Sequence, residues 1–445
     1  MIIRPLAFCG DGPNKENERY TVAVKGEEMS RFDYPMLRNV EVVPVDLKGK
    51  PGVALRDPLS YASEVIALPS DALAVLQFFD GKRSIDDILK EIYSQYGGEG
   101  VINIEDIETL AGSLDDHLFL VSERFFREKR RIDQEFYSSD IRYPIHAGLS
   151  YNSDPEKLTE ELGSYFSNAA PASDDVVEAG DGLKAVIAPH ISITSGGECF
   201  ARSYSAVKAS PKADLYVILG IGHAGIDNLF AGTKKDFETP LGTVKTDVKF
   251  MDRLNESFVG KNSGRLFSGE ALHRTEHTIE FQAVLLKYIF GEEPFVIAPI
   301  LTSFPYQLVV EERFKNDRGV IENFISVLKG GIESYSGRVV IIASVDFAHV
   351  GVKYGAEKPL TTEELDEVKR RDDEMIQIIS SGDAGRFISH IGEDDDKRNI
   401  CGFSAIYIML RVLEGLKGRL LRYDKTIMDN QNSTVTFAGM AFTDD

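Results

Sequence analysis

The chain is poor in cysteine and in long apolar stretches, and both absences narrow its class. It has 445 residues but only three cysteines, which are too few and too scattered for a disulfide framework. A reducing, cytoplasmic setting is therefore the expectation. No apolar run reaches about 18 residues, so we expect no membrane span. The N-terminus quickly turns polar and lacks the apolar core of a signal peptide.

Basic residues are also scarce relative to acidic ones. Lysine and arginine number 50 against 71 aspartates and glutamates, and the formal net charge is -21. This balance argues against nucleic-acid binding, which depends on neutralising phosphates with Lys and Arg. What the chain does have is length and apolar content. Its 43% hydrophobic residues can fill a packed core, and its length predicts two or three domains.

The order of predicted elements divides the chain into four parts. After an N-terminal segment, 1–34, residues 35–125 combine short strands with three helices in a winged-helix pattern. The middle helix of this small domain is acidic, so we expect it to contact protein rather than DNA. Residues 126–140 are predicted to form a linker helix. From 141 to 445 strands and helices alternate, which predicts an α/β sandwich, and two closing strand patterns indicate a mixed sheet.

The spacing of apolar residues locates the individual elements. In the small domain it predicts a helix over 70–81 that starts at Ser70 and a second helix that starts at Ser84. In the larger domain apolar runs predict buried strands, and helical spacing predicts helices. The strands are 184–188, 214–220, 294–300, 338–345, 419–427 and 433–442, and the helices are 197–208, 278–290, 318–330, 362–380 and 401–413.

Ionisable side chains directly follow three of these predicted strands. They are His190, His223, and the pair Asp346 and His349. Because the carboxyl ends of parallel strands share one edge, where ligands bind, we expect these side chains to converge. Cys401 starts a predicted helix and joins the set. Histidines, a carboxylate and a cysteine at one edge suggest a metal site.

Simpler roles remain open for each of these residues. His190 could cap the next helix or be satisfied in the core. His223 lies in GIGHAG, which has dinucleotide-binding spacing, but a hairpin pattern follows instead of the required helix. Asp346 and His349 could be a helix cap and a surface histidine, or a pair suited to proton transfer. Cys401 could be a buried structural cysteine, a thiolate, or the nucleophile of a Cys-His-Asp hydrolase.

Residues 273–277 read H-x-x-E-H, a zinc-protease motif with two ligands and a glutamate base on one helix. Helical spacing begins only at Ile279, so His273 is expected to be exposed in the preceding loop, and the protease is kept as an alternative. His277 lies at a helix N-terminus, where the dipole keeps an imidazole neutral. We expect it to be a polar group near a negatively charged substrate.

In order along the chain, the segments APH, GIGH, FETPLGTV, EHTIE, SVDFAH, NICGFSAI and STVTFAGMAF resemble the MEMO family, also called AmmeMemoRadiSam system B proteins. The resemblance covers about residues 140 to 443. It implies the fold of class III extradiol (LigB-like) dioxygenases, a mixed α/β sandwich. It also implies that His190, His223 and Cys401 ligate a metal ion. Asp346 and His349 would line the pocket, with His349 as the acid/base group.

A cysteine where the dioxygenases use a carboxylate favours copper(I), zinc or iron(II). The resemblance therefore implies an iron, copper or zinc ion, and a metal-dependent, dioxygenase-like oxidoreductase. A second possibility is open, because some members of the family are described as binding phosphopeptides. On that reading the protein is a non-catalytic (phospho)peptide-binding adaptor.

The segment PLSYASEVIALPSDALAVLQFFDGKRSIDDIL resembles PqqD-type domains, which are small winged-helix folds that bind peptides for radical-SAM enzymes. This resemblance implies a radical-SAM or AMMECR1-like partner protein and a peptide ligand. Neither nucleic acid nor a membrane is expected as a partner.

Overall fold

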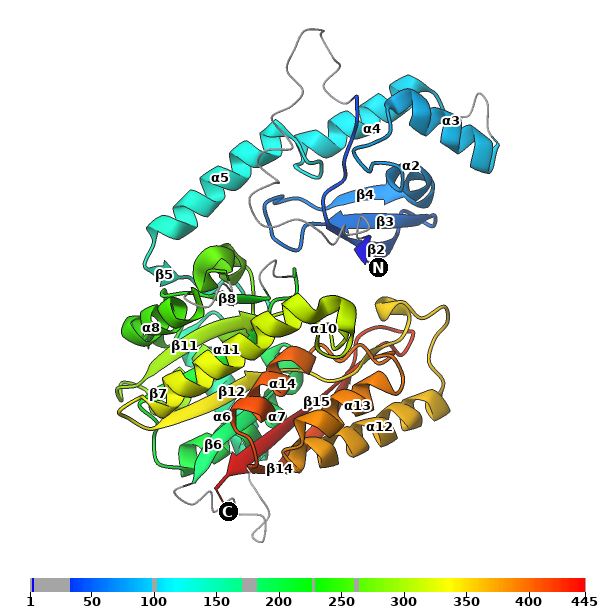
Figure 1. Ribbon diagram of the computed structural model, residues 1–445. Helices are drawn as coiled ribbons and strands as arrows, with labels where there is room; N and C mark the ends of the chain where they lie inside the picture. The colour runs from blue at the N-terminus through cyan, green and yellow to red at the C-terminus, as the bar shows by residue number, and fades with distance from the viewer. Residues whose placement is uncertain are drawn as a thin grey trace. The chain divides into compact units, whose positions relative to one another are not determined.

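The computed structural model describes residues 2–3, 33–97, 102–169, 182–225, 229–259 and 264–444. The chain forms two compact units, Met1–Glu135 and Phe136–Asp445, and each is considered by itself (Figure 1). Most of the expected N-terminal segment, including Cys9, lies outside the described residues.

The first unit packs helices against a small antiparallel sheet with the strand order β1-β2-β3-β4. Its core is built from residues such as Leu55, Ile88 and Phe119. The strands are β1 (Ile2–Ile3), β2 (Val40–Asp46), β3 (Pro51–Arg56) and β4 (Ile66–Pro69). The helices are η1 (Ser70–Ala72), α2 (Leu73–Leu76), α3 (Ile85–Tyr96), α4 (Ile104–Asp116) and α5 (Glu123–Ser138), which ends in the second unit.

Local sequence explains where these helices begin. Ser84, as predicted, caps α3 in a capping box with Asp87, and Asn103 does the same for α4. The continuous helix predicted over 70–81 is wrong. The chain forms only η1 and α2 there and then turns, because Asp80 pairs with Met36 in an isolated bridge.

The second unit is built on one mixed sheet of eleven strands in its described part, ordered β13-β15-β6-β12-β7-β11-β10-β9-β5, with β14 on β15 and β8 on β11. The neighbours β6, β12, β7 and β11 run parallel, and β15 runs antiparallel to β6. The strands are β5 (Ile141–Arg142), β6 (Leu183–Ala188), β7 (Leu215–Ile221), β8 (Phe230–Gly232), β9 (Asp236–Thr239), β10 (Gly242–Thr246), β11 (Val296–Thr302), β12 (Val339–Ser344), β13 (His349–Val350), β14 (Lys417–Ile427) and β15 (Thr434–Thr443).

Helices cover both faces of this sheet, because its central strands are apolar on both sides. In β7, Val217 packs into one core and Ile218 into the other. The first core holds α8 (Val248–Val259), α11 (Lys315–Glu333), α12 (Thr362–Ser380), α13 (Ala384–Gly392) and α14 (Phe403–Val412), of which α11 to α14 lie in front of the sheet in Figure 1. The second core holds α6 (Pro155–Asn168), α7 (Ile193–Ala209) and α9 (Thr278–Phe290).

Shorter helical turns connect these elements. They are η2 (Leu266–Arg274), α10 (Gln307–Val310), η3 (Glu312–Phe314) and η4 (Val352–Tyr354). The predicted α/β sandwich with a mixed sheet is thus confirmed. Helix α7 begins at Ile193, four residues before the predicted start, and α8 and α13 were not predicted.

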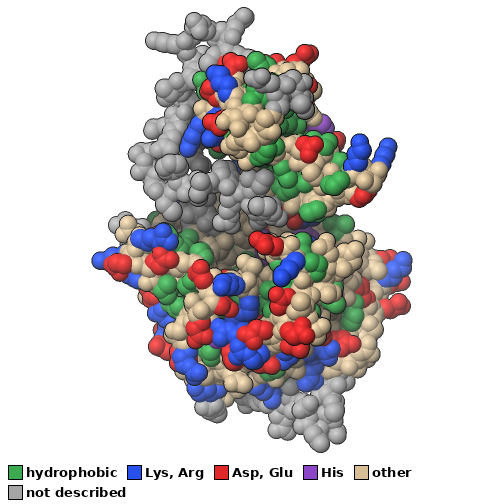
Figure 2. Space-filling model, turned by 90° about the vertical axis from the view of Figure 1, so that its right-hand side faces the viewer, with side chains coloured by type: hydrophobic (Ala, Val, Ile, Leu, Met, Phe, Trp, Pro, Cys, Tyr) green, Lys and Arg blue, Asp and Glu red, His purple; other side chains and the backbone are tan. Residues whose placement is uncertain are grey.

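The charged side chains on the surface and the hydropathy of the helices fit the composition of the chain. On the face drawn in Figure 2, acidic and basic side chains are intermixed over the second unit. Across the described ranges, no helix combines the length and apolar character needed to cross a membrane.

Candidate metal centre

Three neighbouring parallel strands deliver polar side chains to one edge of the sheet. His190 lies two positions beyond the end of β6, His223 two beyond β7, and Asp346 two beyond β12. Since β12 pairs in parallel with both β6 and β7, these positions lie at the same edge. A further residue, His277, is the N-cap of α9, which packs on this part of the sheet.

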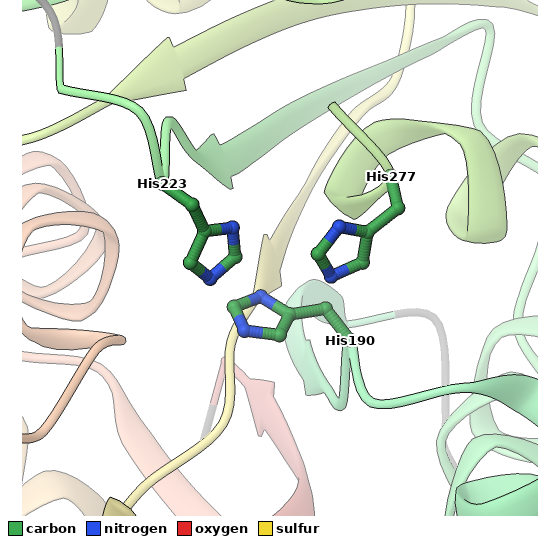
Figure 3. A group of neighbouring side chains, drawn as sticks. All are labelled: His190, His223 and His277. Carbon is green, nitrogen blue, oxygen red and sulfur yellow. The ribbon is translucent and has the colours of Figure 1, made fainter. Parts of the chain in front are cut away.

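The structure brings three imidazoles together there. His190, His223 and His277 each place a ring nitrogen within 4.8 Å of the others, and the rings turn toward one another (Figure 3). The rings of His223 and His277 are stacked, with centroids 5.0 Å apart and an interplanar angle of 8°. His190 meets both rings edge-on, at 5.0 and 5.5 Å.

The second nitrogen of each ring already has an acceptor. Nδ1 of His190 lies 3.0 Å from the carbonyl oxygen of Ser344. Nδ1 of His223 lies 3.2 Å from each carboxylate oxygen of Glu276, and Nδ1 of His277 lies 3.0 Å from Oε1 of the same group. Because these acceptors carry no proton, each Nδ1 donates, and in the neutral form of each ring Nε2 keeps its lone pair. Metal-binding histidines are oriented in this way.

Cys401 lies beside this group but is not a member of it. Its Sγ is 3.3 Å from Nε2 of His190 and 3.6 Å from the carbonyl oxygen of Asp346. Burial raises the pKa of the Cys401 thiol well above its usual range. The residue precedes α14, whose N-cap is Gly402, and this position does not offset the burial. Cys401 would therefore form the expected thiolate only if a cation beside it stabilised the negative charge.

Asp346 and His349 face different partners. Oδ1 of Asp346 accepts the backbone N–H groups of His190 and Ile191 at 2.9 and 3.3 Å, and burial raises its pKa to about 7. Nδ1 of His349 lies 3.2 Å from the carbonyl oxygen of Phe347, and burial lowers its pKa to about 4. Asp346 is thus directed at His190, and these contacts do not form the Asp346–His349 pair that their spacing allows.

The H-x-x-E-H motif does not form one site. His273 lies in η2 and is 1% exposed, with Nε2 2.9 Å from the carbonyl oxygen of Ala231. Burial lowers its pKa to about 4. The expectation that His273 is exposed is wrong, because its ring packs edge-on against Phe237. The motif's other histidine, His277, belongs to the cluster, whereas His273 does not.

Two residues of the site were missed by sequence reasoning. Glu276 was considered only as a protease base, yet it contacts two of the three clustered histidines, and they hold its pKa well below the usual range despite burial. His146 lies with its ring centroid 5.4 Å from that of His277 and its Nε2 3.0 Å from the carbonyl oxygen of Thr275. Its position directly before Ala147 and Gly148, close to the predicted start of the larger domain, was the available signal for it.

Fold and site together define an α/β protein with a histidine cluster at the carboxyl edge of its parallel strands, in which His190 is buried, His277 half-buried and His223 exposed. Residues 142–441 match the model of the family described as Memo-like protein, and the chain belongs to this family. The resemblance drawn from the sequence motifs is thereby confirmed for this part of the chain. The PqqD-type resemblance of residues 35–125 stays a prediction.

Several curated relatives are similar over most of the chain. A MEMO1 family protein of Aquifex aeolicus is 27% identical over 391 residues, which cover 87% of this chain and 95% of the relative. One of Methanopyrus kandleri is 26% identical over 312 residues, 68% of this chain and 98% of the relative. One of Thermus thermophilus is 22% identical over 342 residues, which cover 77% of this chain and 93% of the relative. The Aquifex match is too long to fit within 142–445, so it reaches into the first unit.

Proposed function

We propose that this protein is a metal-dependent oxidoreductase related to class III extradiol dioxygenases, with an iron, copper or zinc ion at the histidine cluster. One observation carries the proposal: three imidazole nitrogens lie within 4.8 Å of one another, and the other nitrogen of each ring is held by an acceptor. Membership of the Memo-like family supports it.

The donor set fits such an ion. Imidazole suits iron, copper and zinc, and a thiolate favours the softer ions among them. We assign His190, His223 and Cys401 as ligands, and His277 as a fourth donor within reach of the first two. A bound ion would supply Lewis acidity and, for iron or copper, electron transfer to oxygen or substrate.

Proton transfer would fall to the neighbouring groups. Asp346, with a pKa of about 7, can hold or release a proton near neutral pH. His349, with a pKa of about 4, is neutral at that pH and can accept one. In the proposed reaction these two residues would serve as separate proton carriers rather than as one coupled pair.

The test is metal analysis of full-length protein purified without chelators. We expect His190→Ala and Cys401→Ala to lose metal, and the control His117→Ala, a histidine of the first unit that bonds to the carbonyl oxygen of Ser113, to keep it. An unchanged metal content in both ligand variants would contradict the assignment. Oxygen uptake with catechol-type substrates then tests the oxidoreductase, with uptake expected for the wild type and absent in His190→Ala.

A second candidate function is a (phospho)peptide-binding adaptor, and exposed apolar side chains favour it. Tyr143, Ile145 and Leu149 are 59, 40 and 80% exposed and flank His146, whose ring contacts the cluster. Where exposed apolar side chains join into a contiguous patch, they mark a ligand or partner contact. A radical-SAM or AMMECR1-like protein would then be the partner. Peptide binding that is weakened by Leu149→Ser, in a protein that takes up no oxygen, would favour this reading.

A further inference from the structure

We propose that Glu276 is a positioning residue that fixes His223 and His277 as one ligand pair with a common tautomer. This inference rests on the proposed metal site and deepens it. Its starting point is that a single carboxylate contacts Nδ1 of both rings, at 3.2 and 3.0 Å. Two ligands that lie 54 residues apart along the chain are thus joined through one side chain.

The carboxylate is itself held in place by the backbone. Its Oε2 accepts the N–H of His223 at 2.9 Å, and its Oε1 accepts those of His277 and Thr278 at 2.8 and 3.2 Å. The backbone carbonyl of Glu276 in turn accepts a bond from the buried guanidinium of Arg142 at 2.8 Å. With five donors converging on two oxygens and its side chain 8% exposed, the group has little freedom to move.

This arrangement excludes the role that the H-x-x-E-H motif gives to its glutamate. A protease base must reach a metal-bound water, but both oxygens of Glu276 are occupied by the donors of the protein itself. The same donors determine the tautomers. A carboxylate can only accept, so Nδ1 of both rings must carry hydrogen, and in the neutral rings both Nε2 atoms are left with lone pairs.

A glutamine at this position cannot reproduce the pattern. Its amide has one accepting oxygen and one donating nitrogen. Whichever oxygen the nitrogen replaces, it faces at least one ring Nδ1. A donor–donor contact there is relieved only if that ring presents an unprotonated Nδ1 and moves its hydrogen to Nε2. That ring would lose its lone pair on the side of the cluster. Disturbing an outer partner of this kind typically costs 10–100-fold in metal affinity, and we expect about that loss for zinc.

The first measurement uses metal-free protein with ¹⁵N-labelled histidine, in which long-range ¹H–¹⁵N correlations report the tautomer of each ring. Signals are assigned by their loss in His223→Gln and His277→Gln. We expect both rings to carry hydrogen on Nδ1 in the wild type and in the control Glu270→Gln, whose carboxylate accepts a bond from Thr233 instead. In Glu276→Gln we expect at least one ring to switch.

The second measurement is zinc affinity, obtained by competition with a chromophoric chelator. We expect a loss of about 10–100-fold in Glu276→Gln and none in Glu270→Gln, with Glu276→Asp between them because it keeps an accepting carboxylate. Unchanged tautomers together with unchanged affinity in Glu276→Gln would overturn the inference. If that variant does not fold, a hydrogen on Nε2 of either ring in the wild type would overturn it. Failure of the wild type to bind zinc, iron or copper would instead remove the proposed function.

Discussion

Asp396 offers a direct measurement of how burial acts on a carboxylate outside the histidine cluster. Burial raises its pKa from 3.8 to about 6, and Asp394 and Asp395 add to the rise, while the N–H of Ile400 and the charge of Arg398 oppose it. The N–H of Ile400 donates to its Oδ1 at 2.9 Å. The perturbation is Asp396→Asn, which keeps that acceptor and removes the charge. Asn also tolerates the positive φ of 51° found here.

The magnitude follows from the shift. Because the folded-state pKa is raised, the protonated carboxyl stabilises the fold at low pH, and this contribution is lost as pH rises through about 6. The difference between a pKa of 3.8 and one of about 6 corresponds to about 3 kcal/mol in all. About half of it, about 1.4 kcal/mol, falls between pH 5 and pH 8. Relative to the wild type, Asp396→Asn should therefore gain about that much between the two pH values.

The assay is urea unfolding of wild type and variant at both pH values. The matched control is Asp429→Asn. Hydrogen bonds from Ser433 hold the pKa of Asp429 below its usual value, so its contribution changes only in more acidic solution. The control should differ from the wild type by the same amount at pH 5 and pH 8. A pH-independent difference for Asp396→Asn, or a loss of stability toward pH 8, would refute the reasoning.

Three further changes test the packing of each unit. Arg142→Met should lower the free energy of unfolding in urea by about 3–5 kcal/mol, because it leaves the buried carboxylate of Glu280 without its ion-pair partner. A decrease below about 1 kcal/mol would contradict this. Phe324→Ala should cost about 3–5 kcal/mol, since that ring is fully buried, and equal melting temperatures would count against it. Asn103→Ala should cost about 1 kcal/mol and speed amide exchange in α4 while leaving α9 unchanged.

Much of the fold could be predicted from the sequence, because the central strands have a clear apolar pattern. β6, β7 and β12 are apolar runs buried on both faces, and the predicted strands differ from them by at most one residue at either end. The start of helix α7 was harder to predict. Its first turn follows the His190 loop directly, and its Gly196 and Gly197 weaken the helical pattern, so the apparent start came late. The failure over 70–81 had a different cause, a tertiary pairing that no local pattern encodes.

Within the candidate site, sequence reasoning located the strand ends but not the orientation of the side chains. Strand order places His190, His223 and Asp346 at one edge, and this could be anticipated from the alternation of elements. Whether Asp346 turns to His349 or to the backbone of His190 depends on the loop geometry after β12, and the structure shows the latter. The role of Glu276 required the distance to His223, which no spacing in the sequence conveys.

The site is assembled from two halves with separate supports. In one half, Glu276 joins His223 and His277. In the other, the end of β12 holds His190 through the carbonyl of Ser344, and Cys401 lies against His190. His190 meets the rings of His223 and His277 edge-on. Behind the rings, Ser344 Oγ donates to the carbonyl of Thr278 and the Gln282 side chain donates to the carbonyl of Pro189, at 2.6 and 2.9 Å. An ion bound by both halves would add a direct connection between the ligand side chains themselves. Metal binding should therefore tighten the two loops together, beyond what either half achieves alone.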